Sequence, residues 1–163
     1  MQTGEAGVGH GKVLLWEYID GRRWSGAVAA EMYEGPVKEC LERAYPGLST
    51  WTILEGNDPT GFRSKAGMTA KEEVGIKVFQ IPKRSPQFTM CDYALWKAME
   101  KRMRAQEKRF APSFRESRVA FLKRLRRAAT RLPSSFINNS LENMKVRCQR
   151  LVAARGGHIE EGR

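Results

Sequence analysis

The amino-acid sequence predicts a mixed α/β domain followed by basic helices. Three apolar segments, residues 12–18, 51–55 and 77–81, have the composition of short strands, and apolar residues at helical spacing occupy the stretches between them. Strands separated by helices favour a mixed or parallel sheet, so we expect an α/β sheet of about three strands. Beyond residue 91 the spacing is helical throughout. A chain of 163 residues is long enough for one domain with a hydrophobic core.

The N-terminal half starts with a glycine-rich segment, residues 1–11, which we expect to be disordered. A turn at Asp20-Gly21 follows the first strand. Helical spacing then continues over residues 25–46, but Gly35-Pro36 interrupts it, because a proline inside a helix loses a hydrogen bond and clashes with the preceding turn. We therefore expect either two short helices or one kinked helix.

The later helices follow from apolar periodicity and from breaking residues. Residues 62–74 are expected to be mostly helical, with Thr69 and Glu72 as a capping box. The remaining helices are expected at residues 91–108, 113–131 and 133–154. The predicted organisation is a disordered N-terminus (1–11), a partial α/β domain (12–108) and a basic helical C-terminal extension (109–163).

The charge is concentrated in the C-terminal half. The net charge is +11, and the segment Lys97–Arg155 carries 17 Lys and Arg residues against 4 Asp and Glu residues. This imbalance suggests a polyanion partner, with nucleic acid as the first candidate, although a solvated basic surface without a specific partner is the alternative. Phosphate contacts would be independent of base sequence and sensitive to salt. The candidate contact residues are Lys83, Arg84, Arg102, Lys123, Arg124, Arg126 and Arg127.

Other residue patterns exclude several classes of protein. Cys40, Cys91 and Cys148 lie far apart without a CxxC pair, and the chain has two histidines, so the sequence argues against a zinc site and a disulfide framework. The N-terminus lacks the pattern of a secretory signal, and no apolar run approaches the length of a membrane span. We expect a soluble intracellular protein without a membrane partner. The run "KRLRR" (123–127) is a candidate nuclear import signal.

The stretch "ILEGNDPTGF" (53–62) runs from a strand into a turn, and a strand that ends in small and acidic residues is a common place for a metal site. Three other segments belong with it: "VLLWEYIDG" (13–21), "SPQFTMCDYALW" (85–96) and "NMKVRCQRLVAARGGH" (143–158). Together these four segments resemble the C-terminal part of the catalytic domain of mariner-type DDE transposases, and they occur in the order of the family.

The resemblance implies an incomplete ribonuclease H-like fold and a metal-dependent DNA strand-transfer chemistry. In that chemistry two divalent ions, with Mg²⁺ favoured by oxygen ligands, activate the attacking oxygen and stabilise the leaving one. By the family's motifs, Asp92 matches the third acid and would be a catalytic metal ligand. Gly56 stands where the second acid belongs, and the first acid should lie upstream of residue 13, outside this chain.

Two neighbouring acids are candidates to replace the missing carboxylate. Glu55 is adjacent in a strand, so its side chain points to the opposite face. Asp58 shares the face of Gly56 but is displaced by about 6–7 Å unless the turn folds back. Asp92 has a second interpretation as the N-cap of its helix.

Four hypotheses follow from these observations. The first is a transposase remnant, derived from a transposable element, that binds DNA but is catalytically inactive. The second is a live metal-dependent phosphoryl transferase that uses Asp58 and Asp92. The third is a non-enzymatic module that pairs with a homologous, intact transposase chain. The fourth is a relic that folds poorly and has no function.

Overall fold

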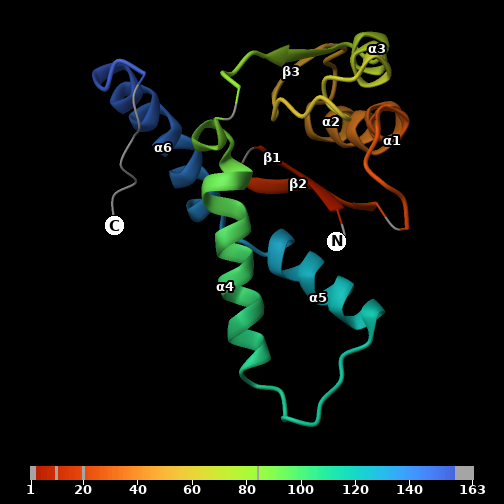
Figure 1. The fold of residues 1–163 in the computed structure, drawn as a ribbon, viewed down its shortest axis with the longest axis vertical. Helices are drawn as coiled ribbons and strands as arrows, with labels where there is room; N and C mark the ends of the chain where they lie inside the picture. Colours follow the sequence, from red (N-terminus) through yellow and green to blue (C-terminus); the bar gives the residue numbers. More distant parts are fainter. Residues whose placement is uncertain (1–2, 10, 20, 84, 157–163) are drawn as a thin grey trace. The chain divides into compact units, whose positions relative to one another are not determined.

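The computed structural model describes residues 3–9, 11–19, 21–83 and 85–156, and it divides into two compact units (Figure 1). The first unit contains the chain up to Gly7 together with Leu14–Thr89. The second unit contains Val8–Val13 together with the chain from Met90 onward. The later division between the units falls after Thr89.

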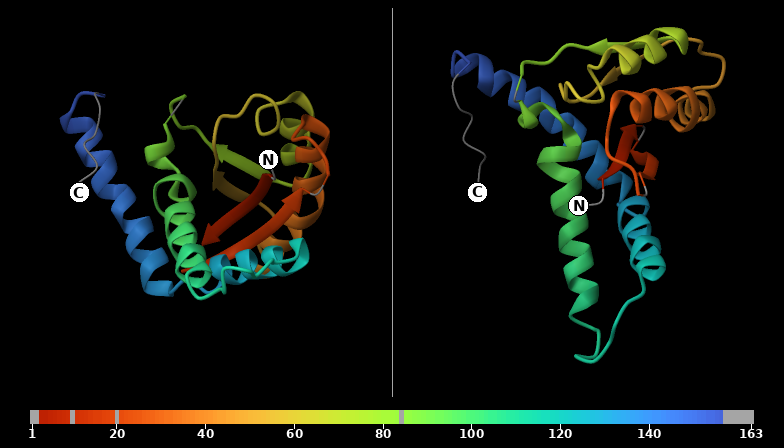
Figure 2. Two further views of the ribbon diagram at one scale, coloured as in Figure 1. Left: turned by 60° about the horizontal axis from the view of Figure 1, so that its bottom comes forward. Right: turned by 45° about the vertical axis from the view of Figure 1, so that its right-hand side comes forward.

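A hairpin begins the chain. Strand β1 (Thr3–Gly9) pairs with β2 (Lys12–Ile19) in a two-stranded sheet, and the two strands run in opposite directions (Figure 2). Gly11 in the connection has a φ of +69°, a left-handed conformation that favours glycine. The expected disorder of residues 1–11 is wrong for 3–9, because backbone pairing needs no side chains; residues 1, 2 and 10 lie outside the described residues.

One continuous helical stretch follows, and it accommodates the expected break. Helix α1 (Gly26–Met32) begins after Ser25, whose side chain accepts a hydrogen bond from the Val28 N–H at 3.4 Å. It continues through a π-helical turn, η1 (Tyr33–Val37), into α2 (Lys38–Ala44). Pro36 lies in the π-helical turn, where the wider hydrogen-bond pattern tolerates the missing N–H. Of the two alternatives, the structure has the single interrupted helix.

The second sheet is a parallel pair. Strand β3 (Trp51–Leu54) pairs with β4 (Ile76–Phe79), with Trp51 opposite Ile76. Helix α3 (Lys65–Glu73) connects them, as a parallel pair requires a crossover. The described residues thus form four strands in two sheets, where about three strands in one sheet were expected.

Helix α3 starts at a cap that the sequence pattern did not single out. The Ser64 Oγ accepts a hydrogen bond from the Gly67 N–H at 3.1 Å and donates one to the Gly61 carbonyl at 2.7 Å. The expected capping box at Thr69 and Glu72 is wrong, because both residues lie inside the helix.

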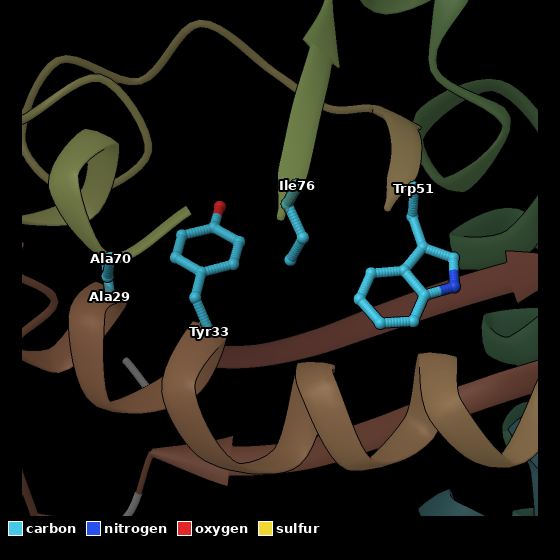
Figure 3. Packing of buried hydrophobic residues seen from close by; sticks show 5 residues of the cluster. All are labelled: Ala29, Tyr33, Trp51, Ala70 and Ile76. Carbon is cyan, nitrogen blue, oxygen red and sulfur yellow. The ribbon is translucent and has the colours of Figure 1, made fainter. Parts of the chain in front are cut away.

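The core of the first unit lies between helices and the parallel strands. Tyr33 projects from the helical stretch towards the strands, and Trp51 and Ile76 project from β3 and β4 towards the helices (Figure 3). Ala29 and Ala70 are buried where α1 meets α3, and their small side chains let the two helices approach closely. This packing fixes the end of β3 relative to α1 and α3.

A short 3₁₀ turn, η2 (Pro86–Phe88), ends the first unit, and helices form the second. The helices of the second unit are the π-helical turn η3 (Cys91–Leu95), α4 (Trp96–Glu107), α5 (Arg118–Thr130) and α6 (Ser134–Ala153). Helix α5 begins five residues later than expected because the Ser117 Oγ caps it, accepting from the Ala120 N–H at 3.2 Å.

The buried residues of the second unit show how its helices pack. Met99 and Met103 are buried on α4, and Ala128 and Ala129 are buried on α5. Helices α4 and α5 contact each other, and Figure 1 shows the long loop that joins them. Within the described ranges, no helix is long and apolar enough to cross a membrane.

Candidate strand-end site and basic surface

Glu55 directly follows β3 and points into the interior of the first unit. Its side chain is 9% exposed, and its carboxylate accepts a hydrogen bond from the Tyr33 hydroxyl at 2.5 Å. The same carboxylate forms an ion pair with the ammonium group of Lys71, whose side chain is 1% exposed. The Lys71 Nζ also donates to the Phe62 carbonyl at 2.7 Å and lies 4.6 Å from the centre of the Tyr33 ring. We call Tyr33, Glu55 and Lys71 the buried cluster.

Within the buried cluster, the negative charge of Glu55 balances the positive charge of Lys71. Burial lowers the pKa of Lys71 because it penalises the charged ammonium, and Glu55 opposes that effect by hydrogen bonding and by its charge. The Arg63 guanidinium adds a further lowering influence on this pKa. A carboxylate that balances a buried ammonium is not available to bind a metal ion at the surface.

Asp58 organises the loop after β3. Its Oδ2 accepts hydrogen bonds from the Trp24 indole N–H and the Gly61 N–H, both at 2.8 Å, and its Oδ1 accepts from the Thr60 N–H at 3.3 Å. Burial alone would raise the pKa of Asp58, but the hydrogen bonds from Gly61, Trp24 and Thr60 outweigh it, so the pKa is lowered. Asp58 is therefore an ionised carboxylate that holds a turn, as aspartates at such positions often do.

Gly56 lies between these two acids in the sequence, and the backbone conformation at this position does not require a glycine. A Cβ atom at this position would meet only the Phe62 ring, at 3.8 Å, which is an ordinary van der Waals contact. Its φ is also outside the left-handed region. The backbone at residue 56 therefore accommodates a Cβ atom, although the sequence supplies none.

Further contacts hold the loop to β4. The Asn57 side-chain amide donates to the Ile81 carbonyl at 3.0 Å and to the Pro82 carbonyl at 3.1 Å. The Trp24 ring packs edge-to-face on Phe62, with ring centres 5.2 Å apart. We define residues 55–64 as the strand-end loop, and its conformation is fixed by these protein contacts.

Asp92 lies in the second unit, in the first turn of η3, and is exposed. The N-cap interpretation is wrong, because the preceding Met90 already has helical dihedral angles and the helix extends before Asp92. The neighbouring Tyr93 donates a hydrogen bond to the Ser140 carbonyl at 2.6 Å, and the Arg147 guanidinium lies 4.1 Å from the Tyr93 ring centre. These contacts fasten η3 to α6.

The side chains at the strand end do not fit a two-metal site. Gly56 has no ligand, Glu55 is paired with Lys71, and both Asp58 oxygens accept hydrogen bonds from the loop and Trp24. Across the part of the chain that the structure describes, no three His, Cys, Asp or Glu side chains gather into a group that could hold a metal ion. No reaction step through a metal ion can be derived from this arrangement.

Two of the basic residues named from the sequence are engaged within the fold. The Arg102 guanidinium donates to the Arg131 carbonyl at 2.8 Å, just after the end of α5. The Arg124 guanidinium binds both oxygens of Glu116, at 2.6 and 2.9 Å, and Glu107 at 3.1 Å. It also lies 5.1 Å from the centre of the Phe110 ring and 5.5 Å from the centre of the Phe121 ring.

The other basic candidates are placed differently. Lys123, Arg126 and Arg127 are exposed on α5, and Lys83 is exposed in the loop after β4. Arg84 lies outside the described residues. The sequence thus located the basic helix but did not distinguish its structural arginines from its exposed ones.

Together, the parallel pair with its crossover helix, the hairpin and the C-terminal helices define a mixed α/β protein. The Mos1 transposase catalytic domain with raltegravir and Mg matches with a TM-score of 0.81 at 19% identity over 98% of this chain and 77% of that chain. The same domain with raltegravir and Mn gives 0.78 at 18% identity over 98% and 83%. The Mos1 mariner paired-end complex with Mn gives 0.77 at 19% identity over 93% and 43%.

These likenesses confirm the predicted fold class and, at the level of the fold, the resemblance to mariner-type catalytic domains. No family model matches the sequence, and no curated protein matches it.

Proposed function

We propose that this protein is a DNA-binding domain of transposase origin that does not catalyse strand transfer. One observation carries the proposal: at the end of β3, residue 56 is glycine, and the carboxylates of Glu55 and Asp58 are committed to partners within the fold. Metal-dependent phosphoryl transfer needs several carboxylates on the ions. The strand end supplies none that is free for this purpose.

DNA is the proposed partner because of charge and of the neighbours' known complexes. The net charge of +11 is concentrated in the helical second unit. Structures similar to this one include the Mos1 paired-end complex with the left transposon end and the Mos1 strand transfer complex. A basic surface that neutralises phosphates binds duplex DNA with an affinity that falls as salt rises.

The proposal is tested with two assays on the full chain. Binding to a fluorescent 30-base-pair duplex is measured by anisotropy from 50 to 300 mM salt, and nicking of supercoiled plasmid is measured with Mg²⁺ or Mn²⁺. We expect salt-sensitive binding and no nicking above that of Asp92→Asn. Metal-dependent nicking by the wild type that Asp92→Asn abolishes would instead establish the live phosphoryl transferase with Asp92 as a metal ligand.

A second candidate function is pairing with an intact homologous transposase. The exposed side of the parallel pair carries two large apolar side chains, Leu54 and Phe79, which lie opposite each other in the strand register. Exposed apolar surface of this kind favours protein contacts. Co-expression with an intact mariner-type transposase, followed by affinity purification and a strand-transfer assay, tests this function. Absence of a stable complex at micromolar concentrations would refute it.

A further inference from the structure

We infer that the solvent-facing side of α5 is the surface that contacts the DNA backbone, and that Arg102 and Arg124 maintain the fold instead. This inference rests on the proposed DNA binding and assigns it to one helix. We define the α5 basic face as Lys123, Arg126 and Arg127.

The spacing of the α5 basic face places its members on one side of the helix. Residues three and four positions apart are neighbours on a helix surface, so Lys123 is adjacent to both Arg126 and Arg127. All three are exposed, whereas Ala128 and Ala129 on the other side of the same helix are buried. The three charged groups therefore project into solvent together.

Helix α5 also differs from its neighbours in having no acidic residue. Its sequence is "RVAFLKRLRRAAT", and within the described residues no ion pair involves the α5 basic face. Helix α4, by contrast, contains Glu100, which pairs with Arg104 at 2.5 Å, and Glu107, which pairs with Arg124. Helix α6 contains Glu142. The positive charge of α5 is thus not balanced along the helix, which favours an anionic partner.

Arg124 explains why the charge of this surface is smaller than the sequence suggests. The run "KRLRR" contains four basic residues, but the Arg124 guanidinium donates hydrogen bonds to Glu116 and Glu107 and lies near the rings of Phe110 and Phe121. Its hydrogen bonds to the Glu116 carboxylate contribute most to raising the pKa of Arg124, so this arginine is engaged within the unit. Only the other three members of the run face solvent.

The spacing of the α5 basic face matches a single DNA strand. Lys123 and Arg127 are separated by about 6 Å along the helix axis, from the rise of about 1.5 Å per residue. Two phosphate steps along one strand cover about 7 Å of the DNA axis. Long, exposed Lys and Arg side chains at this spacing can contact phosphates two steps apart on one strand. Such contacts position a protein on DNA without reading the bases.

The experiment compares two variants that lose equal charge. The first variant combines Lys123→Gln, Arg126→Gln and Arg127→Gln. The control combines Lys97→Gln, Lys101→Gln and Lys108→Gln, which removes three exposed charges from the α4 region. Thermal denaturation checks that both variants fold, and a third variant, Arg126→Lys with Arg127→Lys, retains the charge of the face.

Binding to the fluorescent duplex is measured as a function of salt. Each lost phosphate contact reduces the magnitude of the slope of log K against log salt by about 0.9. The slope of the α5 variant should therefore be smaller in magnitude than that of the wild type by about 2 to 3. We expect its affinity at 50 mM salt to fall at least about tenfold, while the control and the charge-retaining variant lose less than about threefold.

The outcomes separate the two claims. If the wild type does not bind duplex DNA with a salt-dependent affinity, both the proposed function and this inference fail. If the wild type binds but the α5 variant keeps its slope, or loses no more than the α4 control, the DNA surface lies elsewhere and only this inference fails. If the α5 variant does not fold, the exposure of these residues in solution is contradicted and the inference also fails.

Discussion

Substitution of Lys71 by methionine tests the buried cluster that supports the strand-end loop. Methionine has a similar length but removes the ammonium group. Glu55 would then lie in the interior without its cationic partner, with the Tyr33 hydroxyl as its described partner, and the Phe62 carbonyl would lose the donor that now lies 2.7 Å away. The change therefore leaves an uncompensated carboxylate and an unsatisfied backbone acceptor.

We expect Lys71→Met to lower the free energy of unfolding strongly, because the ion pair of Lys71 and Glu55 is shielded from solvent. The Lys71 and Glu55 side chains are 1% and 9% exposed, so screening by water is small. Removing one partner of a buried ion pair costs about 3–5 kcal/mol. In a unit of this size, 1 kcal/mol lowers Tm by about 4–8 °C, so we expect the transition of the first unit to fall by at least about 12 °C.

A double variant separates the charge effect from simple loss of packing. Glu55→Leu combined with Lys71→Met removes both charges, and replacing a buried ion pair by apolar residues is often close to neutral. We therefore expect the double variant to be more stable than Lys71→Met alone in urea and thermal denaturation followed by circular dichroism. A cost below about 1 kcal/mol for Lys71→Met, or additive costs in the double variant, would refute the buried-pair argument.

Two further predictions concern the strand-end loop. Because hydrogen bonds hold the folded-state pKa of Asp58 below its ordinary value of 3.8, its contribution to stability is complete above that pH and is lost as the pH falls through the lowered pKa. The difference in urea midpoint between wild type and Asp58→Asn should therefore be larger at pH 7 than at pH 2.5, and an equal difference at both would contradict this assignment. Gly56→Ala should change stability by less than about 1 kcal/mol, since its Cβ makes only an ordinary contact. Gly61→Ala should cost clearly more in the same denaturation assay, because its Cβ would overlap the Trp24 indole, and equal costs would show that the two positions are misassigned.

Much of the fold could be predicted because its signals are local. The strand expected at 12–18 became Lys12–Ile19, and the helix expected at 91–108 became η3 with α4. These elements depend on apolar periodicity within a short window. Strand β1 was missed because its glycine-rich sequence carries little apolar signal, and its stability comes from pairing with β2.

The starts of helices were harder to predict than their existence. Thr60 and Ser64 precede α3 and Thr69 lies within it, and the sequence does not show which of them caps the helix. Ser64 caps α3 because its hydroxyl also bonds to Gly61, a contact created by the folded loop. Tertiary context therefore decides between local alternatives.

The contacts of the acidic side chains after β3 could not be predicted from the sequence. The turn after β3 was predicted, whereas the partners of its acids were missed because Trp24 is 34 residues from Asp58 and Lys71 is 16 residues from Glu55. A signal was nevertheless present for Lys71. It lies four residues after Gly67 and next to Ala70, on the buried side of α3, where a lysine is unusual unless it is paired.

Protein groups, and not metal ions, fix the conformation of the strand-end loop. A cluster of carboxylates that share metal ions repels itself when the ions are absent, and its geometry then depends on metal binding. Here Asp58 is held by Trp24 and backbone N–H groups, Glu55 is neutralised by Lys71, and Asn57 ties the loop to the end of β4. Each anion therefore has a partner supplied by the protein. Glycine at residue 56 adds no negative charge to the same turn, which agrees with the proposed role in DNA binding without catalysis.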